Sequence, residues 1–356
     1  MTVESSLPGL RPLRMGELLD RIIRLYRQNF LTFIGIVALV QVPLTLIQLL
    51  VTLATLEDPG SQFGSFGSGF GQVTQTSTGT IVTFIITVIS FILVQGVGTA
   101  ALTRSVANNY LGQKTGIVEA YRQIGRVWVS LIGALILAIL FAILLIVWWI
   151  IPCIGWITGL GILLFYVWVI IPLIAPVIVL ERQSATGAIQ RAWSLVRTRF
   201  WWVFGFAFLL IVFNYLLIAG PTLVATLAFE FGIGDPFAPT SDELILRTVV
   251  QTIVNLVFSL LYLPLQLIGF TLLYFDLRVR NEGFDLAILA RETAEGEAFD
   301  AAGTIEAAPK GNSRFFVTWN ELGYFAVISI GIGVLYFGLV FLLAAIFAAT
   351  IGPSGF

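Results

Sequence analysis

The chain has 356 residues, of which 58% are hydrophobic and only 11% are charged; an average soluble domain has roughly 45–50% and about 25%. With a mean hydropathy of +0.97, this composition excludes a soluble globular domain and predicts an all-α, polytopic membrane protein. The net charge of −1 gives no reason to expect a nucleic-acid partner.

Catalytic side chains are scarce. Histidine is absent and Cys153 is the only cysteine, which removes His-based catalysis, intramolecular disulfides and most transition-metal sites. No charged residue lies near the centre of an apolar segment, where proton relays and ion-coupled pumps usually carry one. We therefore expect no catalytic residues, no metal and no cofactor.

Residues 1–14 form a polar tail. In residues 15–30, apolar side chains recur at three- and four-residue steps opposite charged ones, which is the pattern of an amphipathic helix. We expect this helix to lie on the membrane surface and to lead into the first span. An ordinary extension of that span is the alternative.

Seven apolar segments are long enough to cross a bilayer, for which about 20 residues suffice. They are predicted at residues 28–56, 81–103, 127–180 (two spans), 200–229, 248–275 and 324–351. A Gly/Ser-rich loop at 57–80 separates the first two, and a hairpin at 151–155 divides the 54 uncharged residues of 127–180. Pro172 and Pro176 predict a kink in the fourth span.

The predicted spans define four parts of the chain. The tail at 1–14 precedes a six-span membrane domain at 15–285. An Ala/Glu-rich cytoplasmic linker follows at 286–314, because its composition is that of a disordered segment. The seventh transmembrane segment lies within residues 315–356.

Basic amphipathic stretches also precede the third and fifth spans, at residues 104–126 and 181–199, with Ser184 as a predicted N-cap in the second. A shift of 170 residues aligns the first stretch with the third at identical residues. These are Arg21, Leu25, Arg27, Phe30 and Gly35, which match Arg191, Leu195, Arg197, Phe200 and Gly205. The match predicts a parallel repeat of a surface helix followed by a hairpin of spans.

Positive charge divides unevenly between the two sides of the predicted membrane. Eighteen of the nineteen Lys and Arg residues fall on the side of the N-terminus, and only Arg247 falls on the other. The positive-inside rule makes the first side cytoplasmic and places the C-terminus outside. We therefore expect a multi-pass protein of a prokaryotic plasma membrane.

Nine arginines on the cytoplasmic side are candidate contacts for anionic lipid headgroups or for a protein partner. They are Arg21, Arg24, Arg27, Arg122, Arg126, Arg191, Arg197, Arg278 and Arg280. If the helix of the sixth span continues, the spacing also predicts i,i+4 pairs between Asp276 and Arg280, Arg278 and Glu282, and Asn281 and Asp285. Gly283 would normally end that helix. Exposed pairs of this kind contribute little stability.

Six amides form a candidate intramembrane polar cluster: Gln41, Gln48, Gln95, Asn214, Gln251 and Asn255. Gln41 and Gln48 share one helix face, as do Gln251 and Asn255. Hydrogen bonds between helices are the simpler interpretation, at about 0.6 kcal/mol each. A polar pathway or a headgroup pocket is the alternative.

Three stretches, at 13–30, 184–195 and 274–285, resemble the prokaryotic glycerophosphoryl diester phosphodiesterase membrane-domain family. The most specific is Tyr-Phe-Asp-Leu-Arg-Val-Arg at 274–280, and the resemblance covers roughly residues 10–290. It implies a six-span membrane domain, which in that family sometimes accompanies a soluble phosphodiesterase barrel. This chain departs from the family pattern by its seventh span and by the absence of that barrel and its histidines, so phosphodiesterase activity is not expected.

Two functions are weighed for this architecture. The first is a non-catalytic membrane protein that contacts anionic lipids or docks a partner in the membrane through its basic helices. The alternative is a transporter or channel for a small polar or phosphorylated metabolite, passing between proline-kinked helices.

Overall fold

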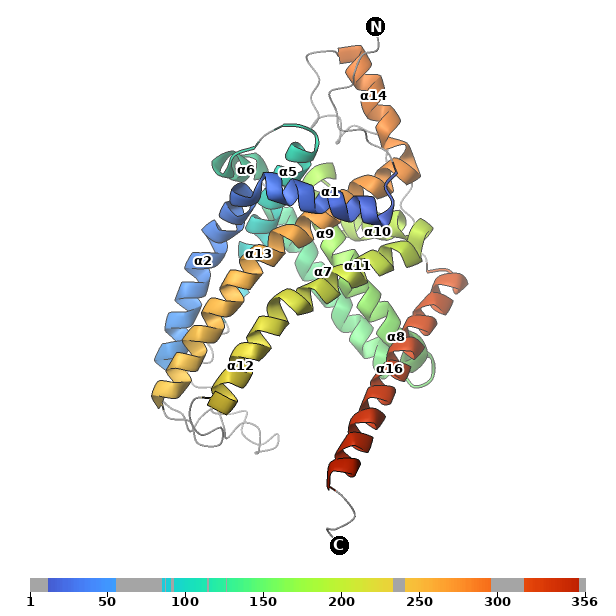
Figure 1. The fold of residues 1–356 in the computed structure, drawn as a ribbon. Helices are drawn as coiled ribbons and strands as arrows, with labels where there is room; N and C mark the ends of the chain where they lie inside the picture. The colour runs from blue at the N-terminus through green and yellow to red at the C-terminus, as the bar shows by residue number, and fades with distance from the viewer. Residues whose placement is uncertain are drawn as a thin grey trace.

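The computed structural model describes residues 12–55, 85–86, 88–90, 93–113, 115–125, 127–232, 241–295 and 317–351. This part of the chain is helical and holds no strand. Seven of its segments are long and apolar enough to cross a membrane: Phe30–Leu53, Val88–Tyr110, Val127–Ile150, Ile154–Glu181, Ala185–Phe229, Asp242–Glu282 and Trp319–Leu342. The predicted fold class, an all-α multi-pass membrane bundle, is confirmed (Figure 1).

The helices follow one another in the predicted order. The N-terminal half contains α1 (Met15–Gln28), α2 (Phe30–Thr55), η1 (Leu93–Gly98), α5 (Thr99–Tyr110), α6 (Ile117–Ile124), α7 (Val127–Ile150), α8 (Ile154–Phe165), η2 (Tyr166–Ile170) and α9 (Ile171–Glu181). The second half contains α10 (Ala185–Val196), η3 (Arg197–Arg199), α11 (Phe200–Asn214), η4 (Tyr215–Ala219), α12 (Gly220–Gly232), α13 (Ser241–Glu282), α14 (Phe284–Glu295) and α16 (Trp319–Ile351).

The charged helices gather at one end of the bundle. In Figure 1, α1, α6, α10 and the C-terminal end of α13 all lie at the upper end, which is called the charged end below. The α7–α8 hairpin and the last residues of α16 lie at the opposite end. This arrangement agrees with the alternation of spans that the sequence predicts.

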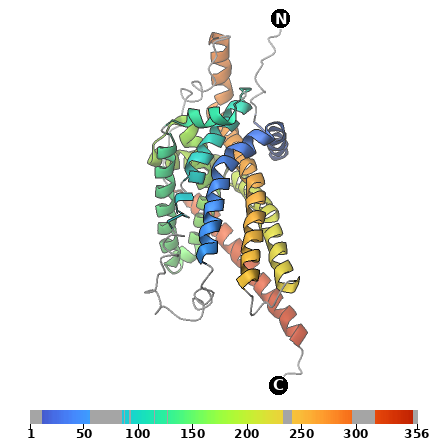
Figure 2. The same cartoon turned by 90° about the vertical axis from the view of Figure 1, so that its left-hand side faces the viewer.

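The helix α1 packs against the protein with its apolar face. Leu18, Ile22 and Leu25 are buried, and α1 contacts α13 more extensively than it contacts α2. The helix crosses in front of α13 in Figure 1 and lies on the outside of the bundle in Figure 2. Its amphipathic pattern therefore reflects contact with a neighbouring span, and the face directed outward is polar except for Ile23.

Each surface helix rests on the end of an even-numbered span. Helix α6 packs on α5, α10 packs on α9 and α7, and α1 packs on α13, so that α1 joins the two ends of the six-span domain. The helical conformation is interrupted between surface helix and span at Asn29 (φ −122°, ψ 25°) and again at Arg199 (φ −135°, ψ 43°). These positions are 170 residues apart, which is the offset of the predicted repeat.

π-Helical turns lie next to prolines in the fourth and fifth spans. The π-helical turn η2 immediately precedes α9, whose first turn contains Pro172, and the π-helical turn η4 ends just before Pro221. Proline cannot donate a backbone hydrogen bond, and π-type turns take up the resulting mismatch. A π-helical turn therefore lies just before Pro172, while Pro176 lies inside α9, and the kink predicted for these two prolines stays a prediction.

Helix α16 packs on α8 through a small residue. The backbone N–H of Gly161 donates to Ser329 Oγ at 2.7 Å, and a Cβ atom at Gly161 would lie 2.1 Å from the carbonyl oxygen of Phe325. Only glycine permits this approach. The seventh segment therefore has a specific contact with the six-span domain.

Several predictions fall partly outside the described residues. They concern most of the N-terminal tail, the loop at 57–80, Arg126, and the linker beyond residue 295. Residues 284–295, which include the start of that linker, form α14 (Phe284–Glu295).

Candidate functional site

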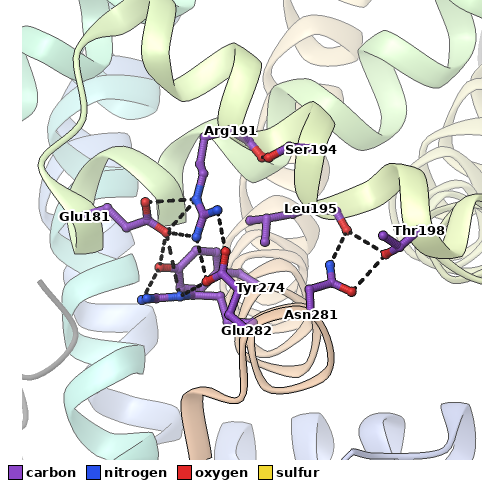
Figure 3. Close-up of polar contacts among 9 residues, drawn as sticks. Glu181, Arg191, Ser194, Leu195, Thr198, Tyr274, Asn281 and Glu282 are labelled. Atoms are coloured by element: carbon purple, nitrogen blue, oxygen red, sulfur yellow. Dashed lines mark hydrogen bonds and ion pairs between the residues drawn. The ribbon is translucent and has the colours of Figure 1, made fainter. Parts of the chain in front are cut away.

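The end of the sixth span is buried in a network of four charges. Glu181 ends α9, Arg191 lies on α10, and Arg278 and Glu282 lie on the last turns of α13 (Figure 3). The side chains of these four residues are 0–6% exposed. We call Glu181, Arg191, Arg278, Glu282 and the adjoining Tyr274 the ion network.

Arg191 is the centre of the ion network. Its Nε atom lies 3.1 Å from both carboxylate oxygens of Glu181, and its NH1 and NH2 atoms lie 2.5 and 2.7 Å from the two oxygens of Glu282. Such paired contacts are the strong geometry for a guanidinium and a carboxylate. Arg191 therefore joins the end of α9 to the end of α13.

Arg278 completes the ion network from the other side. Its Nε atom donates to Glu282 at 3.0 Å and lies 3.8 Å from Glu181, and its NH1 atom donates to the hydroxyl of Tyr274 at 3.1 Å. The Tyr274 hydroxyl in turn donates to Glu181 at 2.9 Å. Two arginines thus face two carboxylates, so the buried charges sum to zero.

Two further contacts tie the same turns to their neighbours. Asn281 donates to the carbonyl of Leu195 and accepts from Thr198, both at 2.9 Å (Figure 3). The Asn281–Asp285 pair, expected only if the helix continued past Gly283, does not form, because α13 ends at Glu282 and the Asn281 amide bonds to Leu195 and Thr198. Gly283, with φ 62°, ends α13 as predicted.

The start of α1 is fixed to α13 by a second set of contacts. Leu13 N–H donates to Asp276 at 2.7 Å, and Arg280 donates to Asp276 at 2.7 Å and also to the carbonyl of Leu13. The Arg280 guanidinium lies over the Trp202 ring at 5.8 Å from its centroid. The predicted pairs Asp276–Arg280 and Arg278–Glu282 both form, but they are buried rather than exposed.

Arg191 and Arg278 do not reach the membrane surface. Both are buried and bind carboxylates, so the prediction that they meet lipid headgroups is wrong. Arg21 donates to the hydroxyl of Tyr110 at 2.8 Å, and Arg197 lies 3.2 Å from Glu321 at the start of α16. Most of the predicted basic surface thus holds helices together.

Three of the candidate arginines remain exposed. Arg24 and Arg27 line a shallow groove of about 510 Å³ on the outer face of α1, together with Asp20. Within the described residues neither guanidinium is held by an ion pair, although Asp20 lies four residues before Arg24. Arg122 on α6 is 75% exposed, with Glu119 at 3.4 Å.

Four of the six amides meet in one groove between α2 and α13. Gln41, Gln48, Gln251 and Asn255 line this amide groove, which has a volume of about 410 Å³. Gln41 donates to Ser259 at 2.6 Å and Gln251 to Thr226 at 3.1 Å. These bonds between helices agree with the simpler interpretation of the amides.

The other two amides lie elsewhere. Gln95 faces a central cavity of about 240 Å³ that five of the six core spans line, and Gln266 faces it from α13. Asn214 ends α11 just before η4. The six amides therefore do not form a single cluster. Gln266 was missed although it carries the signal that marked Gln251, an amide within an uncharged apolar span.

Comparison with protein-family models, curated proteins and solved structures finds no match to this chain. The resemblance of residues 274–285 to a phosphodiesterase membrane domain stays a prediction. Its arginines and carboxylates nevertheless have a physical role in this fold, since Arg278 and Glu282 lie in the ion network and Asp276 and Arg280 hold the start of α1.

Proposed function

We propose that this chain is a non-catalytic membrane protein whose charged end lies at the cytoplasmic surface of a prokaryotic plasma membrane and binds anionic lipid headgroups. Arg24, Arg27 and Arg122 supply the contacts. The uneven distribution of Lys and Arg supports this orientation. The resemblance of residues 274–285 to a family of membrane domains supports a function within the membrane.

The groove on α1 carries the proposal. Arg24 and Arg27 are three residues apart on an exposed helix face, and both line the groove. Because the apolar face of α1 packs on α13, its polar face is directed away from the bundle, at the level where the spans end (Figure 2). Basic residues near an anionic leaflet contribute about 1 kcal/mol each, so three contribute about 3 kcal/mol, or roughly 100-fold in affinity.

Charge-neutral variants test the proposal. Retention of phosphatidylglycerol by the protein in maltoside micelles is measured for the wild type and for an Arg24→Gln, Arg27→Gln, Arg122→Gln variant at several salt concentrations. The Gln variant should bind roughly 100-fold more weakly and with less dependence on salt. A matched variant with Lys at the same positions should keep most of the affinity. Equal binding by the wild type and the Gln variant would rule the proposal out.

The central cavity favours a second candidate, a transporter or channel for a small polar or phosphorylated metabolite. Neither Gln95 nor Gln266 makes a hydrogen bond to another described residue, and unpaired amides within a membrane are costly. A glycerophosphodiester flux into liposomes that falls in a Gln95→Leu, Gln266→Leu variant would favour transport. A flux no greater than that of empty liposomes would exclude it.

A further inference from the structure

A second arginine-lined pocket lies inside the charged end, away from α1. It has a volume of about 440 Å³, and α5, α6, α7 and the end of α9 surround it. Arg104 lines it from α5 and Arg182 from the residue after α9. Among the described residues that line it there is no carboxylate. We call this site the Arg104–Arg182 pocket.

The backbone of Arg182 is in an unfavourable conformation. Its φ of 50° and ψ of 40° are left-handed, and its N–H caps α9 by donating to the carbonyl of Ile178 at 3.0 Å. Glycine usually occupies such a cap because a β-carbon is strained there. The cap itself uses only the backbone of Arg182, so the fold does not require an arginine side chain for it.

The polar walls of the pocket are held in place by contacts of their own. The Gln123 amide accepts from Asn108 at 2.8 Å and donates to Glu119 at 3.0 Å, and Ser130 donates to the carbonyl of Gln183 at 3.2 Å. Glu119, the nearest carboxylate along these contacts, lies 3.4 Å from Arg122, which offsets its charge. Arg182 and Gln123 are exposed, so the rim of the pocket is open to an entering ligand.

From these observations we propose that the Arg104–Arg182 pocket binds one phosphate ester group, with the two guanidiniums sharing its negative charge. Planar guanidiniums with several donors suit phosphate oxygens, and they bind them more strongly than neutral donors do. A lipid phosphodiester and a soluble phosphate monoester offer the same chemistry to this site. The site shares no residue with Arg24, Arg27 and Arg122, so it does not depend on the surface contacts proposed above.

The Arg182→Gly variant separates binding from folding. Glycine removes the guanidinium and adopts the left-handed cap without strain, and the unfolding temperature, measured beside the affinity, shows whether a weaker binding comes with a loss of fold. Two probes are titrated into the full chain in maltoside micelles: phosphatidylglycerol and glycerol 3-phosphate. Native mass spectrometry then gives the affinity of the tightest site. We expect at least a tenfold loss in Arg182→Gly and in Arg104→Gln, and a smaller loss in Arg182→Lys.

The two probes identify the source of the phosphate. A tight site for phosphatidylglycerol alone assigns the pocket to a lipid headgroup, and one for glycerol 3-phosphate alone assigns it to a soluble ester. The Arg24→Gln, Arg27→Gln variant, which leaves Arg122 beside Glu119 in place, should leave this tightest site unchanged even where it weakens the surface contacts. The proposal is overturned if the wild type has no tight site for either probe, or if Arg182→Gly binds both as well as the wild type does.

Discussion

At the scale of single residues, Arg278 shows what a local sequence pattern can predict and what it cannot. The i,i+4 spacing of Arg278 and Glu282 predicted their pair, which forms at 3.0 Å. The spacing did not predict that the pair is buried, because Glu181 and Arg191 approach it from 97 and 87 residues earlier in the chain. Glu181 was missed altogether, although it is the first charge after 54 uncharged residues.

Removing one charge of the ion network should be costly, whereas removing a pair should be tolerated. Arg278→Met leaves two buried carboxylates facing the single guanidinium of Arg191, and the expected loss is about 3–5 kcal/mol of unfolding free energy. Arg278→Met combined with Glu282→Gln restores neutrality and should recover much of that loss. Unfolding in mixed micelles measures both variants. A double variant whose loss equals the sum of the two single losses would contradict the charge balance described here.

The raised pKa of Tyr121 predicts that the protein loses unfolding free energy at alkaline pH. Its hydroxyl donates to the carbonyl of Ile36 at 2.5 Å and so joins α6 to α2. Burial raises the pKa of Tyr121 from 10.0 to about 12. Because the unfolded chain loses this proton first, the stabilising effect is complete below pH 10.0 and is lost as the pH rises through about 12. Thermal unfolding across this range should show a smaller decline for Tyr121→Phe than for the wild type, and identical declines would contradict the assignment.

At the scale of elements, period and composition predicted most helices but not their partners. The pattern of residues 15–30 predicted an amphipathic helix, and α1 forms there. Its buried residues Leu18 and Ile22 pack on α13 and not in lipid. Helical periodicity reports which face is apolar, and it carries no information on what covers that face. The same limit applies to the amides. The spacing of Gln41 and Gln48 predicted that they share a helix face, but only the fold shows that Gln251 lines the same groove.

The α8–α16 contact should depend on the size of residue 161. A Cβ atom at Gly161 would collide with the backbone at Phe325, so Gly161→Ala should weaken the contact and Gly161→Leu should abolish it. A protease site inserted at 301–310 would free the fragment that contains α16, and its co-purification with the rest of the chain is then measured.

The matched control for this experiment is Gly133→Ala on α7, where a Cβ atom would meet nothing within 4 Å. The fragment should stay bound in the wild type and in this control, and it should be released in Gly161→Leu. Retention of the fragment in Gly161→Leu would show that α16 is held by other contacts.

At the scale of the whole molecule, the spans and their alternation could be predicted because charge and hydropathy alternate so sharply along the chain. Which spans pack against each other could not be predicted, because an uncharged segment such as 127–180 is apolar on every helix face and no face is marked for contact with a neighbouring helix. The predicted repeat describes the fold only in part. Identical residues such as Arg21 and Arg191 predicted two similar units of surface helix and span, and the helix interruptions at Asn29 and Arg199, 170 residues apart, support that. Yet Arg21 meets a tyrosine hydroxyl and Arg191 two carboxylates.

The orientation of the charged end is the claim on which the proposed function depends, and the single native cysteine tests it. Cys153 is exposed in the α7–α8 hairpin, at the opposite end of the bundle from α1 (Figure 1). An impermeant maleimide added to intact cells should label wild-type Cys153. It should fail to label a Cys153→Ser, Gln113→Cys variant until the cells are opened, because residue 113 lies just after α5 at the charged end. Labelling of residue 113 in intact cells, with Cys153 protected, would reverse the orientation and contradict the account.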